Sequence, residues 1–246
     1  MKKTALLAAA AALFVATPAF AQSAGSIGLN YTNVEDEGDA YQLDGAFGGA
    51  SGAIGYQIDA GLGQLDNDFD SQTIAGHLYW NGGGWRLGGV IAHTHIEFGD
   101  SLSETVYGIE GTWDLGPQTV LLGSYTIGEA EAEGDFDTSS FDIGMNYYFV
   151  DNFRVGGAYG FGNLDVGAVD VDTSNWRLNA EWQPWTTPVS FTLGYNSFDI
   201  DGSNGGTDSW TIGARWNFGA STLRERDNAT PFDARTGYIQ RLLDLR

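Results

Sequence analysis

The chain has 246 residues, with 32 Asp and Glu against 11 Lys and Arg, and its formal net charge is -21. So acidic a chain offers no basic surface for neutralising phosphates, which excludes nucleic acid as a partner. It has no cysteine, which excludes disulfides, thiolate metal sites and a cysteine nucleophile, and its 42% hydrophobic residues argue against disorder.

The first 21 residues predict a secretory signal peptide. Lys2 and Lys3 give a positive start, an apolar run follows from residue 5 to residue 16, and residues 19–21 read Ala-Phe-Ala. The apolar run is too short to span a bilayer as a helix. We therefore expect residues 1–21 to be removed and the mature chain to work outside the cytoplasm.

Between residues 26 and 218, apolar and polar residues alternate in one segment after another. In 141–149, Phe141, Ile143 and Met145 share a face, whereas Asp142 and Asn146 lie on the other. A period of two is typical of strands with two unlike faces. We predict twelve strands, and only in the seventh is the facing ambiguous: 27–32, 41–48, 54–63, 74–80, 85–92, 105–113, 119–129, 141–149, 153–162, 176–182, 189–196 and 209–218.

The connections between these strands are of two alternating kinds. One set is short and nearly uncharged. The other carries 21 Asp and Glu and no Lys or Arg, at residues 34–40, 65–71, 96–104, 129–138, 165–172 and 199–208. In an up-and-down meander alternate connections lie at the same end, so one end of the protein is predicted to be a strongly acidic rim.

The two strand faces distinguish a membrane barrel from a soluble one. The apolar face carries bulky side chains, and many aromatic residues lie beside the short turns, as in the girdle of a membrane protein. Arg86, Arg154, Arg177 and Arg215 all fall on the polar face. A soluble barrel would bury the apolar face, but these features favour an all-β, antiparallel up-and-down transmembrane β-barrel of 12 strands over residues 22–218.

The closing strand, SWTIGARWNF at 209–218, ends with Trp216 and Phe218 on one face. Together with the signal peptide and the repeated aromatic–glycine strands, it resembles Gram-negative outer-membrane β-barrel proteins of the porin type. The resemblance implies that Trp216 and Phe218 form the signal read by the barrel-assembly machinery. It also implies outer-membrane lipid and lipopolysaccharide as surroundings, with the N-terminus, the short turns and the C-terminal tail in the periplasm.

With the polar face turned inward, the lumen becomes a charged wall. The expected function is a porin-like channel for passive diffusion of small hydrophilic solutes and ions, with a mild cation preference from the acidic rim. The alternative is a closed structural or surface-interaction barrel whose acidic loops carry the function, because paired charges could fill so narrow a lumen. The predicted pore-lining residues are Asp44, Gln57, Asp59, His77, Arg86, Glu110, Asp142, Asn146, Arg154, Arg177, Glu181, Asn196 and Arg215.

We expect no enzyme, cofactor or metal site. His93, His95 and Glu97 share an outward phase near the acidic end, but no nucleophile is placed beside a histidine by spacing alone, since Ser101 and Ser103 lie in the next connection. These three side chains have ligand types suited to a transition metal. We interpret them instead as interfacial residues beside lipid headgroups.

Residues 219–246 break the strand pattern and carry 5 basic and 4 acidic residues. Thr222 and Glu225 have capping-box spacing, and Tyr238, Ile239 and Leu242 have helical spacing. Three interpretations remain open: a disordered periplasmic extension, a short helix that plugs or lines the periplasmic mouth, and a docking segment for a periplasmic partner. We favour the first, with a marginal helix at 236–244.

Overall fold

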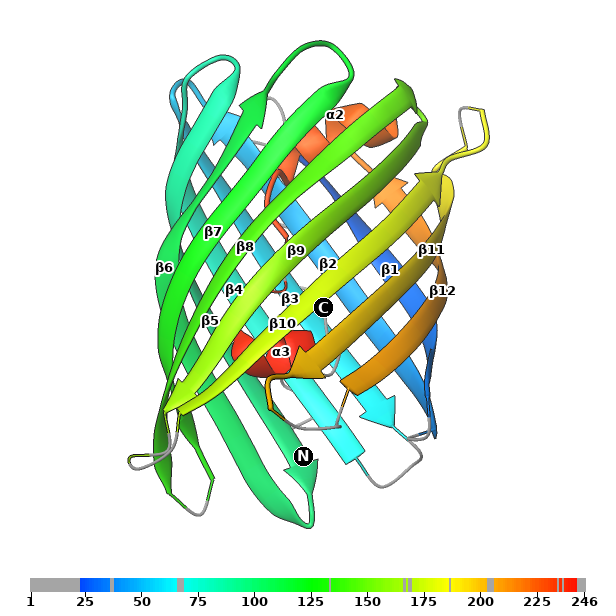
Figure 1. Ribbon diagram of the computed structural model, residues 1–246. Helices are drawn as coiled ribbons and strands as arrows, with labels where there is room; N and C mark the ends of the chain where they lie inside the picture. The colour runs from blue at the N-terminus through cyan, green and yellow to red at the C-terminus, as the bar shows by residue number, and fades with distance from the viewer. Residues whose placement is uncertain are drawn as a thin grey trace, which may run out of the picture.

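The computed structural model describes residues 23–35, 38–65, 69–132, 134–165, 167, 170–185, 187–202, 206–233, 235 and 237–242. The predicted signal peptide lies outside the described residues. Within them, twelve antiparallel strands close into one barrel, because β1 pairs with β12 and every other neighbour follows chain order (Figure 1). The predicted 12-stranded up-and-down β-barrel is confirmed.

Each strand has 12 to 16 residues, more than the roughly 9–11 that a tilted strand needs to cross a bilayer. Their bounds are β1 Ser23–Val34, β2 Gly38–Ser51, β3 Ile54–Leu65, β4 Phe69–Asn81, β5 Trp85–Phe98, β6 Asp100–Asp114, β7 Thr119–Glu131, β8 Asp135–Val150, β9 Phe153–Asp165, β10 Asp170–Trp182, β11 Val189–Ile200 and β12 Gly206–Phe218.

The alternation in the sequence becomes two opposite faces of the wall. Large apolar side chains point outward and remain exposed, such as Leu29 at 62% and Leu78 at 65%, whereas the inward side chains are mostly polar and buried. In β7, the strand of ambiguous facing, Tyr125 and Ile127 point outward and Thr126 points inward. Such a wall suits a surrounding of hydrocarbon for two reasons. Its outer side chains are apolar, and closure of the barrel pairs the backbone N–H and C=O groups of every strand edge. No described helix has the length and hydropathy of a membrane span.

The two ends of the barrel differ as predicted, but the acidic connections are shorter than expected. We call the end with the turns after β2, β4, β6, β8 and β10 the short-turn end, and the opposite end the acidic end. β5 runs to Phe98 and β6 starts at Asp100, with a turn at Gly99, whose φ is 85°. The predicted connection 96–104 is thus mostly strand, because polar residues on both faces hide the alternation there.

The C-terminal tail lies inside the barrel. It forms two short helices, α2 (Leu223–Ala229) near the short-turn end and α3 (Tyr238–Leu242) nearer the acidic end (Figure 1). Leu223 is fully buried and Ile239 is 3% exposed. For the described residues of the tail, the favoured expectation of a disordered extension is therefore wrong. Within the range 236–244, where a helix was expected, the described residues Tyr238–Leu242 are helical, and a second helix forms at Leu223–Ala229.

Candidate functional site

The lumen is the candidate site, and every predicted pore-lining residue lies on its inner wall. Nearly all are buried; Asn146 and Arg154 are partly exposed to the lumen. The set comprises Asp44, Gln57, Asp59, His77, Arg86, Glu110, Asp142, Asn146, Arg154, Arg177, Glu181, Asn196 and Arg215. Their part in conduction stays a prediction.

The wall charges are joined to one another across neighbouring strands. His77 on β4 has its Nε2 atom 2.8 Å from an oxygen of Asp59 on β3, and its Nδ1 atom 2.7 Å from an oxygen of Glu110 on β6. At the closing seam, Nη2 of Arg215 on β12 lies 2.8 Å from an oxygen of Asp44 on β2, across β1. These pairs make the inner wall a connected polar surface.

Helix α2 begins with the cap that the sequence predicts. The Thr222 hydroxyl accepts a hydrogen bond from the Glu225 backbone N–H at 3.1 Å, and the Glu225 carboxylate accepts one from the Ser221 N–H at 2.7 Å. A capped start stabilises so short a helix and fixes the angle at which the chain turns into the lumen.

An ion-pair network fixes α2 to the wall. Arg226 donates to both oxygens of Glu181, at 2.6 and 2.8 Å. Asp227 accepts hydrogen bonds from Arg154 at 2.8 Å and from the Tyr148 hydroxyl at 2.7 Å. Both tail charges therefore meet wall groups of opposite or complementary character, which matters because an unpaired buried charge is costly.

Phe232 holds the middle of the tail against the wall. Its ring stacks on His77, with centroids 5.7 Å apart, and meets the Tyr79 ring edge-on at 5.1 Å. The Gln57 side-chain amide pairs with the Phe232 backbone, donating to its carbonyl at 2.9 Å and accepting from its N–H at 3.0 Å. The wall thus recognises both the side chain and the peptide group of this residue.

The start of helix α3 lies against the carboxylate of Glu104. Glu104 on β6 is 1% exposed, and it accepts hydrogen bonds from the backbone N–H groups of Tyr238 at 3.0 Å and Ile239 at 2.9 Å. The Thr138 hydroxyl also donates to Glu104, at 2.9 Å. Arg241 forms an ion pair with the wall carboxylate of Asp142.

The tail does not fill the lumen completely. A cavity of about 170 Å³ remains between the tail and the wall, and its lining comes from strands all round the barrel. On β7 and β9 it meets uncharged side chains such as Leu122, Ser124 and Ala158. The cavity also reaches tail residues from Arg226 to Arg235. A space of this size holds a few water molecules. Its wall is mixed, because charged residues such as Asp142 and Arg154 also line it.

The sequence did not reveal several residues that hold the tail: Tyr79, Glu104, Tyr148, Arg226, Asp227 and Phe232. Glu104 falls in a predicted acidic connection. It is six residues from Glu110, and an even spacing along one strand would place both side chains on the same, inward face. That spacing was the signal by which Glu104 could have been found. No comparable signal marked Phe232, because it lies between two helices in a segment without periodicity.

Outside the barrel, β5 and β6 form a second polar group. Nδ1 of His95 lies 2.8 Å from the Ser103 hydroxyl, and its Nε2 lies 3.5 Å from a Glu97 oxygen. His93 makes the same cross-strand contact with Thr105, at 2.9 Å, so the contact follows from the register of the two strands.

Among the described residues, no group of three or more His, Asp or Glu side chains is placed to hold a metal ion, and the set His93, His95 and Glu97 is no exception. The lumen itself offers charged and hydrogen-bonding side chains along its wall.

Solved structures with the same fold are outer-membrane proteins. The NanC porin aligns with a TM-score of 0.56 at 9% identity, covering 77% of this chain and 98% of that one. The KdgM porin in complex with disordered oligogalacturonate gives 0.55 at 8%, covering 78% and 98%. The translocator domain of the autotransporter NalP from Neisseria meningitidis gives 0.54 at 11%, covering 84% and 92%.

No protein-family model and no curated protein sequence matches the chain. At these identities the structural likeness concerns the fold. The chain has the closed antiparallel barrel fold of outer-membrane porins and related outer-membrane β-barrels.

Proposed function

We propose that this protein is an outer-membrane channel through which small hydrophilic solutes and ions diffuse passively. The observation that carries the proposal is the orientation of the wall: bulky apolar side chains face outward, and charged side chains line a closed interior. The fold shared with porins supports the same location. Diffusion through such a lumen needs no catalytic group or cofactor.

The channel is proposed to sit with its short turns in the periplasm and its acidic end outside the cell. The outward face would then contact membrane lipid and lipopolysaccharide, and Trp216 and Phe218 would be read by the barrel-assembly machinery. In the structure Trp216 is 55% exposed and Phe218 stacks on Phe47, with centroids 6.3 Å apart. Both rings therefore lie near the end at which β12 stops.

A mild preference for cations follows from the charges that an ion would meet. On the described strands, buried carboxylates outnumber arginines: Asp44, Asp59, Glu104, Glu110, Asp142 and Glu181 against Arg86, Arg154, Arg177 and Arg215. The connections at the acidic end add further negative charge. A negative lumen and mouth raise the local concentration of cations.

The second candidate function is a closed structural or surface-interaction barrel. The tail favours it, because residues of α2 and α3 occupy the lumen of the described structure. A single measurement separates the two functions. Purified full-length protein, refolded in detergent and inserted into planar lipid bilayers in KCl, is expected to give discrete conductance steps. Folded protein that inserts without any conductance would favour the closed barrel.

A further inference from the structure

The tail occupies the lumen in two places that differ in how far they can move. Helix α2 starts at Leu223, and only residues 219–222 separate it from the end of β12, so α2 cannot leave the short-turn end. Helix α3 starts at Tyr238, and residues 230–237 separate it from α2. Eight residues reach at most about 29 Å when extended, which is enough for a five-residue helix to leave its position in the lumen.

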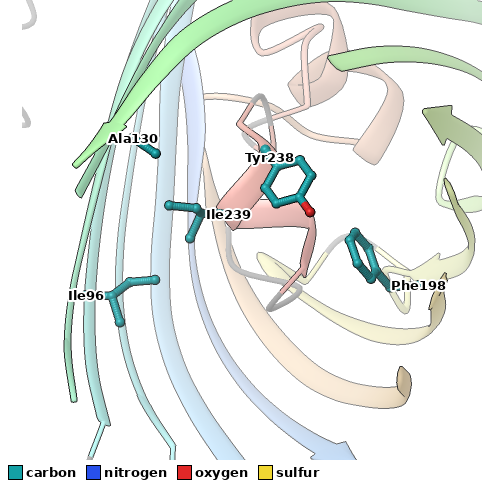
Figure 2. Packing of buried hydrophobic residues seen from close by; sticks show 5 residues of the cluster. All are labelled: Ile96, Ala130, Phe198, Tyr238 and Ile239. Carbon is teal, nitrogen blue, oxygen red and sulfur yellow. The ribbon is translucent and has the colours of Figure 1, made fainter. Parts of the chain in front are cut away.

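Helix α3 closes the lumen by bridging opposite walls. Figure 2 shows Ile239 directed toward Ile96 and Ala130 on one wall, and Tyr238 directed toward Phe198 on the other. These strands, β5, β7 and β11, lie on opposite sides of the barrel. Apolar contacts thus connect the two walls through α3.

The remaining cavity stops at this bridge. Its described lining runs from Tyr148 and Arg226, near the short-turn end, to Arg177 and Arg235, and takes no described residue of α3. The cavity therefore extends beside α2, whose residues Arg226, Asp227 and Asn228 line it. The described residues that close its acidic side are those of α3 and the wall residues packed on them.

The polar seat of α3 centres on Glu104. Its two oxygens accept from Tyr238 and Ile239 at the first turn of the helix. Gly237 makes this approach possible, because a Cβ at that position would collide with a Glu104 carboxylate oxygen. One ion pair, between Arg241 and Asp142, also holds α3 to the wall. In α2 two tail charges, Arg226 and Asp227, are each paired with wall residues.

We propose that α3 is a gate at the acidic end of the channel, latched by Glu104, which opens while α2 stays anchored. The proposal rests on the proposed channel function and adds its regulation. In the closed state α3 spans the lumen. In the open state α3 leaves its position in the lumen, and solutes pass along the cavity, between wall residues that include Leu122 and Ser124 on β7 and the charged Asp142 on β8.

The first test locks the gate in the full-length protein. A Cβ at Gly162 would lie 3.0 Å from Cδ2 of Tyr238, and the natural chain has no cysteine, so Gly162→Cys with Tyr238→Cys places one disulfide between wall and gate. Single-channel recording in KCl is expected to show conductance in reducing buffer and its loss on oxidation. Equal conductance in both states, with the disulfide verified by mass spectrometry, would overturn the gate.

The second test weakens the latch. Glu104→Gln replaces one acceptor oxygen by an amide that meets a backbone N–H, and it is expected to raise the ratio of open to closed time about tenfold without changing the open conductance. Glu129→Gln is the matched control, because it removes the same charge from the neighbouring strand on the outer face. If the ratio of open to closed time is the same in the two variants, Glu104 does not hold the gate closed.

The single-channel recordings distinguish a wrong gate proposal from a wrong channel proposal. If the native protein and the reduced cysteine variant are both folded, as shown by β-type circular dichroism and heat-modifiable gel migration, and neither conducts, the channel function is wrong. If both conduct and oxidation changes nothing, the channel stands and the gate is wrong.

Discussion

At the scale of single residues, Glu181 shows how the wall and the tail depend on each other. Its carboxylate accepts hydrogen bonds from Arg226 at 2.6 and 2.8 Å, from Arg154 at 3.1 Å and from the Ser190 hydroxyl at 2.6 Å. The carboxylate is almost fully buried. It therefore neutralises one arginine of the wall and one of the tail at a position that solvent hardly reaches, and both arginines need it.

Glu181→Ala is expected to destabilise the folded barrel by about 1.5–3 kcal/mol, because Arg226 and Arg154 lose their charged hydrogen bonds to Glu181 and keep Asp227 as their remaining carboxylate partner. The midpoint of urea unfolding in detergent, followed by tryptophan fluorescence, measures the loss. Glu129→Ala, at an exposed position on the outer face, serves as the control and should shift stability by less than about 0.5 kcal/mol. An unfolding midpoint equal to that of the control would show that the network adds no stability.

At the scale of elements, the strands could be predicted from the sequence, whereas the tail could not. Strands such as 141–149 alternate strictly, because one face meets an apolar and the other a polar environment, and the alternation marks the strand directly. Helix α2 is marked in the sequence only by its N-terminal cap, at Thr222 and Glu225. Its partners, Glu181 and Arg154, lie far away in the sequence, and no local pattern links them to Arg226.

The same reasoning explains which part of the candidate site was foreseeable. The phase of a strand places a side chain on the inner wall, so His77 and Glu110 could be assigned to the lumen from their positions alone. Phase does not tell whether the lumen holds water or another segment. That depends on contacts across the barrel, such as the stacking of Phe232 on His77.

The seat of α2 depends on a glycine of β2. A Cβ at Gly48 would collide with the backbone carbonyl oxygen of Ala229, the last residue of α2, and would lie 2.8 Å from the carbonyl oxygen of Tyr56. Both atoms belong to the backbone, so neither moves aside by a change of rotamer. Gly48→Ala is therefore expected to shift α2 and to destabilise the protein by about 1–3 kcal/mol.

Gly45→Ala is the control for this prediction. Gly45 lies on the same strand with the opposite facing, and a Cβ there meets its closest neighbour, the Ser26 carbonyl oxygen, at an ordinary 3.5 Å. Limited proteolysis measures how accessible α2 is. Trypsin should cut after Arg224 and Arg226 faster in Gly48→Ala than in Gly45→Ala. Equal cutting rates would show that β2 tolerates a side chain under α2.

At the scale of the whole molecule, charge is distributed unevenly along the barrel axis. The connections at the acidic end have many carboxylates, whereas the short turns have almost none. Inside, the tail contributes Arg226, Arg235 and Arg241 to a wall in which carboxylates predominate. The tail is thus complementary in charge to the lumen that holds it, and its displacement leaves the lumen more negative.

Cation preference is therefore expected to be strongest in the open state and at low salt. Under a tenfold KCl gradient across a planar bilayer, the reversal potential should have the sign of a K⁺-selective channel. The preference should weaken when both solutions are made more concentrated, because the screening length falls from about 10 Å at 0.1 M to about 3 Å at 1 M. Charges on the wall of a narrow lumen are screened less than charges on the exposed connections.

This difference allows the two sources of selectivity to be separated by substitution. Neutralising Glu129 and Glu131 together, at exposed positions near the acidic end, should reduce the preference at 0.1 M and have little effect at 1 M. Neutralising Asp44 in the lumen should reduce it at both concentrations, because Arg215 then loses its partner and adds a free positive charge to the path. A reversal potential of the anion-selective sign in the native protein would contradict the cation preference itself, whatever the variants show.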